Sequence, residues 1–192
     1  MGNSLFVKAT NERLWEMEVF LEEKAFTNII MSAAEVFKHE CYGCLLGYKL
    51  DSSIIVETAI PYQTAERSFS AVELKKKQRD VIEKVLKTFP KLKAIGEFHS
   101  HPQHGDAKGI TALSDSDREN LKEEDLEIII AINNKQRSRQ WKYNEDKTLS
   151  GSFSDYYFKI AAYYYNGYTN HEPVKTMLWC PSAIGLRYKR SK

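Results

Sequence analysis

The sequence predicts a single α+β domain built on a mixed β-sheet, and three observations lead to this fold class. The chain has 192 residues, of which 42% are hydrophobic and 12% aromatic, and this composition suits one domain with a substantial core. Strand-like runs are interspersed along the chain with helix-like runs. Several of the predicted strands follow one another directly, as they do in hairpins.

Each predicted element rests on its hydrophobic period or its residue types. Helical spacing of apolar residues, or a helix-start pattern in the last case, predicts helices at residues 24–38, 70–89 and 114–122. Alternating apolar or clustered β-branched residues predict strands at residues 16–21, 41–50, 53–60, 92–101, 126–133 and 139–145. Residues 155–168 are ambiguous, because Tyr and Phe favour a strand whereas Ala161 and Ala162 favour a helix.

Charge and cysteine content exclude several classes of protein. The formal net charge of +2 is too small to indicate a nucleic-acid partner. Three cysteines do not make a disulfide framework, and Cys41 and Cys44 would face opposite sides of a strand, so they cannot share a metal ion. No run approaches the roughly 20 apolar residues of a membrane span. We therefore expect a cytoplasmic protein that does not contact a membrane.

Two histidines at the end of a predicted strand indicate a metal site. His99 and His101 are two residues apart, so their side chains point to the same face of the strand. Two converging imidazoles suit Zn²⁺, which binds neutral histidine nitrogen. The alternative is a pair of polar residues with no ligand, placed where the strand becomes a loop.

A catalytic zinc site needs a third ligand and an open position. The candidates for the third ligand are Asp106, Asp115 and Asp117. Ser114 and Asp117 also form the Ser-x-x-Asp pattern of a helix N-terminus, in which the serine caps the first turn. The two interpretations are compatible, because a helix start can hold an aspartate rigidly toward a metal ion.

Three motifs in this order resemble a known family. "ECYGCLLG" (40–47), "GEFHSHP" (96–102) and "SDSD" (114–117) are similar to the signature of the JAMM or MPN+ (Mov34/PAD-1-like) zinc metalloproteases, in their prokaryotic JAB-type form. The resemblance spans about residues 16–145. It implies a curved mixed sheet flanked by helices, with layering like that of cytidine deaminases. On this basis we expect a catalytic domain at 1–165 and an irregular C-terminal extension at 166–192.

The resemblance also implies a role for each matching residue. Glu40 matches the general base, and His99, His101 and Asp117 match the three zinc ligands. Ser114 matches the serine that stabilises the tetrahedral intermediate. This chain departs from the family in one respect. The fifteen residues between His101 and Asp117 form a longer connection than is usual.

We expect the long connection to carry a flap and Glu97 to play a supporting part. Residues 102–113 contain two glycines and polar side chains, the composition of an exposed loop, so we expect a mobile flap beside the metal with His104 or Lys108 near its tip. Glu97 lies on the same strand face as His99. It is a rival for the base, but we prefer it as the partner that orients a histidine ligand.

The predicted function is that of a zinc-dependent metallopeptidase or isopeptidase. Family members imply hydrolysis after the C-terminal tail of a ubiquitin-like protein, by a zinc-bound water that Glu40 activates. Such a tail could bind along a sheet edge. The alternatives are a non-catalytic MPN-type binding or scaffold module and a zinc amidohydrolase that acts on a small molecule.

Overall fold

The computed structural model describes residues 17–63, 66–67, 72–73, 76–89, 91–167 and 172–186 of the chain. Within these ranges there are eleven strands: β1 (Glu18–Leu21), β2 (Tyr42–Lys49), β3 (Ser53–Pro61), β4 (Glu66–Arg67), β5 (Val72–Glu73), β6 (Lys93–Pro102), β7 (Leu126–Asn134), β8 (Lys142–Tyr143), β9 (Leu149–Phe153), β10 (Tyr156–Tyr164) and β11 (Val174–Trp179). The same ranges contain four short helices: α2 (Glu23–Glu35), α3 (Lys76–Leu86), α4 (Asp115–Asn120) and α5 (Pro181–Gly185).

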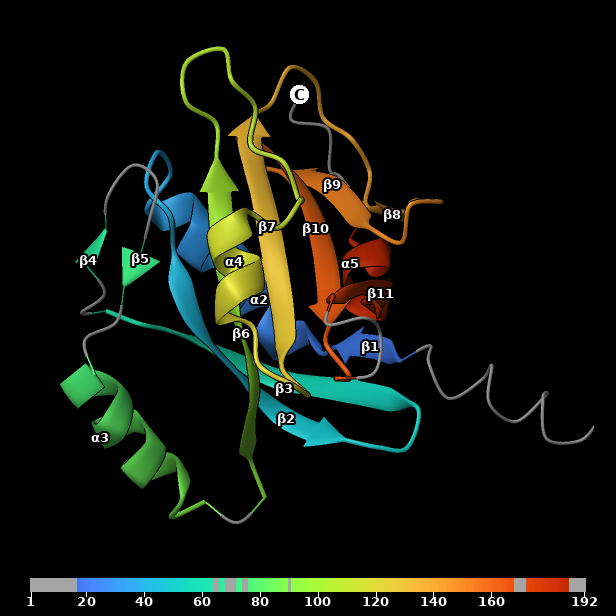
Figure 1. The fold of residues 1–192 in the computed structure, drawn as a ribbon. Coiled ribbons are helices and arrows are strands. Elements are labelled where there is room, and N and C mark those ends of the chain that lie inside the picture. Colours follow the sequence, from blue (N-terminus) through green and yellow to red (C-terminus); the bar gives the residue numbers. More distant parts are fainter. Residues whose placement is uncertain are drawn as a thin grey trace, which may run out of the picture.

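The expected α+β fold, a curved mixed sheet flanked by helices, is wrong, because the chain is mostly β and its sheet closes into a barrel (Figure 1). Strands pair in the order β11-β1-β3-β2-β6-β7-β10, and β10 also pairs with β11, so that seven strands form a closed ring. β9 and β8 extend from β10 beyond the ring. Closure satisfies the backbone hydrogen-bonding groups that two edge strands would otherwise expose.

The strand that closes the barrel comes from the segment where we expected irregular structure. β11 runs parallel to β1, with Glu18 opposite Met177, and antiparallel to β10, with Ala162 opposite Thr176. The helix α5 follows it directly. Residues 174–185 are therefore part of the sheet and its core. The assignment of residues 1–165 to a catalytic domain stays a prediction.

One face of every barrel strand contributes to a single hydrophobic core, into which α2 packs. Phe26 of α2 meets Trp141 edge to face, with ring centroids 5.0 Å apart, and Trp141 stacks on Phe158 of β10. The largest fully buried side chains include Phe98 and Phe158. The core therefore lies on the inner side of β6 and β10, and it fixes which residues of these strands can face outward.

The face of β2, β6, β7 and β10 that points away from this core, here called the outer face, carries two smaller clusters. Cys44 and Leu46 of β2 pack with Tyr62 beneath Ile82 and Leu86 of α3. On the other side, Leu113, which precedes α4, packs on three residues of β7 and β10: Ile129, Ala161 and Tyr163. The outer face of β6 lies between these clusters, with α4 in front of it in Figure 1.

Most of the predicted elements occur, with shifted ends. The predicted strands at 41–50 and 53–60 are the antiparallel pair β2 and β3, and the ambiguous segment 155–168 contains a strand, β10. The helix predicted at 70–89 begins only at Lys76, and part of the segment before it lies outside the described residues. In β10, pairing with neighbouring strands therefore outweighs the helix preference of Ala161 and Ala162.

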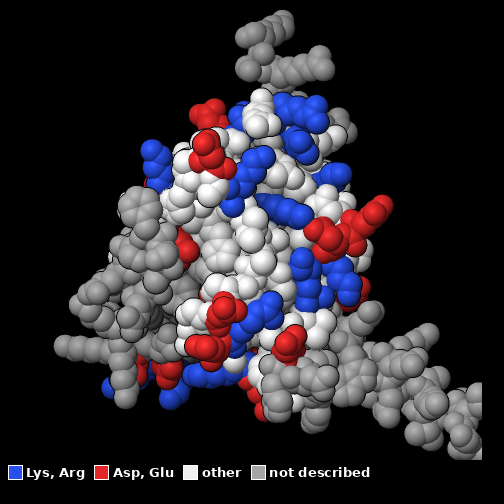
Figure 2. All heavy atoms as spheres, turned by 45° about the horizontal axis from the view of Figure 1, so that its top comes forward, with Lys and Arg blue, Asp and Glu red and all other residues white. Residues whose placement is uncertain are grey.

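Charged side chains of both signs are interspersed on the described part of the face shown in Figure 2, around a central area of uncharged residues. This pattern accords with the net charge of +2. Among the described residues, no helix combines the length and the apolar character needed to cross a membrane.

The barrel core predicts a contrast between two phenylalanines of one hairpin. Phe158 of β10 is fully buried, whereas Phe153 of β9 is 54% exposed. Phe158→Ala should lower the free energy of unfolding by about 3–5 kcal/mol, because it leaves a cavity in the core. Phe153→Ala should change it by less than about 0.5 kcal/mol. Equilibrium unfolding in urea measures both, and equal losses would contradict this description of the core.

Candidate metal centre

β6 presents both histidines on the outer face. Phe98 points into the core, and the hydroxyl oxygen of Ser100 accepts a hydrogen bond from the backbone N–H of Cys41 at 2.9 Å. His99 and His101 consequently point outward, and their Nε2 atoms are 3.0 Å apart. His99 is buried, with 8% of its surface exposed, and His101 is half-buried.

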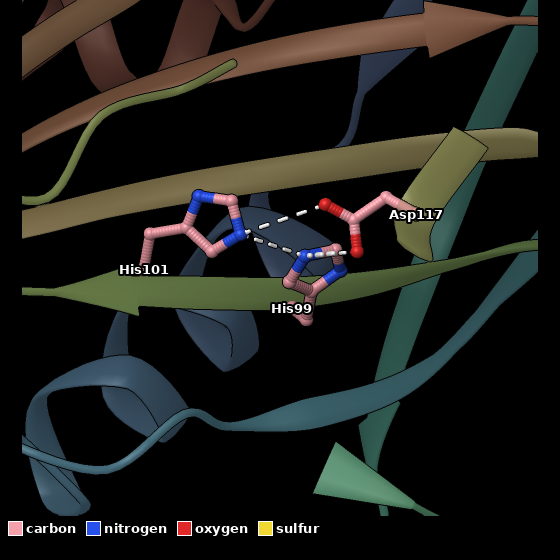
Figure 3. A group of neighbouring side chains, drawn as sticks. All are labelled: His99, His101 and Asp117. Atoms are coloured by element: carbon pink, nitrogen blue, oxygen red, sulfur yellow. Dashed lines mark hydrogen bonds and ion pairs between the residues drawn. The ribbon is translucent and has the colours of Figure 1, made fainter. Parts of the chain in front are cut away.

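Asp117 completes the group from the first turn of α4 (Figure 3). Its Oδ1 lies 3.3 Å from Nε2 of His99, and its Oδ2 lies 3.8 Å from Nε2 of His101. The Ser114 hydroxyl accepts a hydrogen bond from the Asp117 N–H, and the Asp117 carboxylate accepts one from the Ser114 N–H at 2.7 Å. This capping box fixes the direction of the aspartate, so the capping role and the ligand role coexist in one residue.

Hydrogen bonds to the other ring nitrogens fix both imidazoles. Nδ1 of His99 lies 2.7 Å from Oε1 of Glu127, and Nδ1 of His101 lies 2.8 Å from the backbone oxygen of Ile110. A carboxylate and a carbonyl only accept hydrogen bonds, so each Nδ1 carries the hydrogen. When both imidazoles are neutral, the lone pairs of their Nε2 atoms point toward Asp117, as metal ligation requires.

The separations of these atoms fit a tetrahedral ion. Ligand atoms about 2.0–2.1 Å from a tetrahedral Zn²⁺ are roughly 3.3 Å apart. The two Nε2 atoms are 3.0 Å apart, and the nearest carboxylate oxygens of Asp117 lie 3.3 Å from His99 (Oδ1) and 3.8 Å from His101 (Oδ2), while one ligand atom from each residue lies within 4.8 Å of the others. Two lone pairs and a carboxylate that converge in this way repel one another unless a cation or a proton lies between them. The group of His99, His101 and Asp117 can therefore hold a metal ion.

The pKa shifts of the three candidate ligands indicate how a proton competes with a metal ion for the space between them. Burial lowers the pKa of His99, but hydrogen bonds to Asp117 and Glu127 outweigh burial and raise this pKa to about 10. For His101, burial and the nearby His99 lower the pKa. Burial tends to raise the pKa of Asp117, but the hydrogen bond to His99, the charge of His99 and the hydrogen bonds with Ser114 together outweigh burial and leave this pKa well below its usual range. Without metal, the Nε2 atom of His99 thus carries a second hydrogen, which it donates to the ionised carboxylate of Asp117.

Glu40 lies next to this group, immediately before the Cys41–Ser100 hydrogen bond that aligns β2 with β6. It is half-buried. Burial raises the pKa of its carboxyl group, His99 opposes this rise and Asp117 adds to it. The carboxyl group of Glu40 is therefore close enough to the metal centre for the charges of His99 and Asp117 to affect its pKa.

Sequence reasoning missed Glu127. We preferred Glu97 as the partner of a histidine, but Glu97 accepts a hydrogen bond from the hydroxyl of Tyr42 and lies 3.5 Å from that of Tyr62. The partner of His99 is Glu127, from the neighbouring strand β7. A signal was present, because Glu127 interrupts the apolar run "LEIIIAI", and a buried carboxylate needs a partner.

The other candidates lie apart from the centre. Asp106 and Asp115 are both exposed, the first in the loop after β6 and the second at the start of α4. Cys41 and Cys44 are buried in different clusters on opposite sides of β2, as expected, and neither joins the histidines. Ser114, which is exposed, lies at the N-terminus of the helix that carries Asp117.

The ligand assignment predicts which aspartate holds the metal. We expect one metal ion per chain, most of it lost in His101→Ala and in Asp117→Ala. Asp106→Ala and Asp115→Ala are matched controls that should retain it, because both side chains are exposed and outside the group. Elemental analysis after dialysis measures the content. If a control variant loses the metal while Asp117→Ala keeps it, the assignment is wrong.

The raised pKa of His99 predicts a proton released on metal binding. Because this pKa is raised to about 10, His99 is an imidazolium at neutral and mildly acidic pH, and the metal must displace the proton on its Nε2 atom. At about pH 6, where zinc-bound water stays protonated, binding should release about one proton, and affinity should rise about tenfold per pH unit. Calorimetry in buffers of different ionisation enthalpy measures the release. Affinity that is independent of pH would contradict this protonation state.

A family comparison spans the residues of the candidate metal centre. The family model of prokaryotic homologs of the JAB domain matches residues 22–144, a span that includes Glu40, both histidines and Asp117. No curated protein matches the chain significantly. The solution structure of protein DSY2949 from Desulfitobacterium hafniense is similar in fold, with a TM-score of 0.57, 14% identity and coverage of 84% of this chain and 92% of that one. Because the family match covers more than half of the sequence, the resemblance is confirmed, and the chain belongs to the family of prokaryotic homologs of the JAB domain.

Proposed function

We propose that the chain is a cytoplasmic, zinc-dependent peptidase that hydrolyses a peptide or isopeptide bond after the C-terminal tail of a ubiquitin-like protein. The observation that carries this proposal is the convergence of His99, His101 and Asp117 with Glu40 beside them. Membership of the JAB family supports it, and the complete ligand set argues against a module that only binds partners.

Zinc is the metal that this ligand set suits best. Two imidazoles and one carboxylate are ligands typical of catalytic zinc, and three protein ligands leave one coordination position open. When bound there, zinc would polarise the scissile carbonyl and lower the pKa of a water molecule at the open position. Glu127 and the Ile110 carbonyl would hold the two imidazoles in the required orientation.

Glu40 has the properties of a general base. A carboxylate whose pKa is raised binds a proton more readily than an ordinary one, and a base works best when its pKa approaches the working pH. Burial raises the pKa of Glu40 in this direction. In the proposed reaction Glu40 accepts a proton from the attacking water and passes it to the leaving amine, so no covalent intermediate with the chain is needed.

We assign Ser114 the role of stabilising the developing oxyanion. Its hydroxyl oxygen accepts the hydrogen bond from the Asp117 N–H, and a hydroxyl that accepts one bond can still donate its own hydrogen. The residue is exposed and lies at the same helix end as the ligand Asp117. In the proposed reaction it donates this hydrogen to the oxygen of the scissile carbonyl.

The position of the centre supports a chain-like substrate rather than a small molecule. The centre lies on the outer face, and His101 and Asp117 are only half-buried, so an extended tail can reach them. Two surface hollows, of about 300 and 1030 Å³, are lined by other residues. Closure of the barrel leaves its seven strands without an edge. The tail would therefore lie across the outer face beside α4 and not extend the barrel as an added strand.

Substitution of the base and of the oxyanion donor tests the mechanism. On reporter fusions of ubiquitin-like proteins, Glu40→Gln should keep the metal and lower turnover at least about 10²-fold. Ser114→Ala should lower turnover about 10²-fold and cost about 1 kcal/mol of stability through the lost cap. The exposed Glu57→Gln and Ser116→Ala are matched controls and should retain normal turnover.

Each outcome separates the alternatives. Near-normal turnover of Glu40→Gln would remove this residue from the mechanism. If the metal-loaded wild-type chain cleaves no fusion, whether linear or lysine-linked, the non-catalytic alternative gains support. Cleavage of a small amide in place of the fusions would support the amidohydrolase alternative.

A further inference from the structure

The loop between β6 and α4 is fastened to the barrel on both sides of its tip. On the outgoing side, the backbone N–H of Gln103 donates to the carbonyl of Ile132 at 2.9 Å, and the Gln103 side-chain oxygen accepts from the N–H of Asn134 at 3.1 Å. Residues 105–108 form an exposed tip. The flap that the composition predicts is thus limited to this tip, because the rest of the loop is tied to β7.

The returning side of the loop, residues 109–113, is held at its first residue by an amide side chain. The Gly109 N–H donates to Oδ1 of Asn133 at 2.9 Å, and Nδ2 of Asn133 donates to the Gly109 carbonyl at 3.1 Å. Asn133 is buried, with 8% of its surface exposed, near the end of β7. An amide offers a donor and an acceptor together, so it can satisfy both backbone groups of one residue, which a carboxylate or a hydrocarbon cannot.

These two hydrogen bonds between Asn133 and Gly109, here called the clamp, hold the loop backbone close to β6, the strand that carries the histidines. A Cβ atom at Gly109 would lie 1.9 Å from the backbone oxygen of His101, so only glycine permits the approach. The next residue, Ile110, provides the carbonyl that accepts the Nδ1–H of His101 at 2.8 Å. The orientation of the His101 imidazole therefore depends on where Asn133 holds the loop.

The same segment continues to the third ligand. The hydroxyl of Tyr163 donates to the carbonyl of Thr111 at 2.8 Å, and Leu113 is buried on the outer face of β7 and β10. Ser114 then begins the capping box that fixes Asp117. Residues 109–113 thus connect the positions of two candidate ligands that come from different elements.

We propose that Asn133 is a positioning residue for the metal centre. It holds Gly109 and Ile110 against β6, and the Ile110 carbonyl then keeps His101 in the tautomer and orientation that direct Nε2 toward the metal. This inference rests on the proposed metal site, but it does not depend on hydrolysis. His99 has its own partner, Glu127, and provides an internal reference, because the clamp should not affect it.

The experiment compares three substitutions with a matched control. Asn133→Asp keeps the shape and the acceptor but places a carboxylate oxygen against the Gly109 carbonyl. Asn133→Ala removes the clamp. Gly109→Ala disturbs the clamp at its other partner, because the added Cβ atom would collide with the backbone oxygen of His101. Asn144→Asp is the control, because Asn144 also bridges backbone and side-chain groups, those of Thr148 and Ser150, but lies outside the metal group.

Three readouts distinguish positioning from general support of the fold. Nitrogen-15 NMR of the metal-free chain should show His101 losing its preference for the Nδ1–H tautomer in all three variants, while His99 is unchanged. Zn²⁺ competition with a chelator should show an affinity about tenfold lower, the lower end of the range for residues that orient ligands. The Co²⁺ absorption spectrum should change in the same variants. Asn144→Asp should match the wild type in all three measurements.

Every result bears on the inference. Folded Asn133 variants with an unchanged His101 tautomer and unchanged Zn²⁺ affinity would overturn it. Loss of the folded barrel in both Asn133→Ala and Gly109→Ala would also overturn it, because the residue would then support the fold as a whole. A wild-type chain that binds no Zn²⁺ would refute the proposed function, whereas the tautomer measurement would still test the clamp.

Discussion

The burial of Phe98 determines the geometry of the metal centre. Because side chains alternate along a strand, fixing Phe98 in the barrel core forces His99 and His101 to the outer face. A shift of β6 by one residue would bury both imidazoles and expose the phenylalanine, at the expense of a fully buried aromatic side chain. The hydrophobic core therefore sets the register of the site, and closure of the barrel stabilises that core from both ends of the sheet.

Polar contacts orient the three candidate ligands within the register that the hydrophobic core determines. Each histidine is oriented through its Nδ1 by a different kind of acceptor: a buried carboxylate from β7 for His99 and a loop carbonyl for His101. Glu127 is costly to bury alone, and its hydrogen bond to His99 offsets that cost. Asp117 is fixed by a helix cap. A different contact therefore holds each candidate ligand: a carboxylate for His99, a loop carbonyl for His101 and a helix cap for Asp117. The ligands can converge although they come from different parts of the sequence.

Sequence patterns predicted the local features of this protein better than its long-range pairings. The histidine pair and the Ser-x-x-Asp cap depend on residues close in the chain, so their spacing alone indicates their geometry. Closure of the barrel could not be predicted in this way. Val174–Trp179 is a short strand between two prolines, and its parallel partner β1 lies near the other end of the described chain. Glu127 and Asn133 act on groups 28 and 24 residues away, and no local period reveals such contacts.

The central claim is that two imidazole nitrogens and one carboxylate hold zinc on the outer face of a closed barrel. X-ray absorption at the zinc edge of the loaded chain tests it most directly, because zinc–sulfur bonds of about 2.3 Å differ clearly from zinc–nitrogen and zinc–oxygen bonds of about 2.0–2.2 Å. The account predicts a shell of nitrogen and oxygen atoms only, with the outer scattering of two imidazoles. Sulfur in the shell, or a single imidazole, would contradict it.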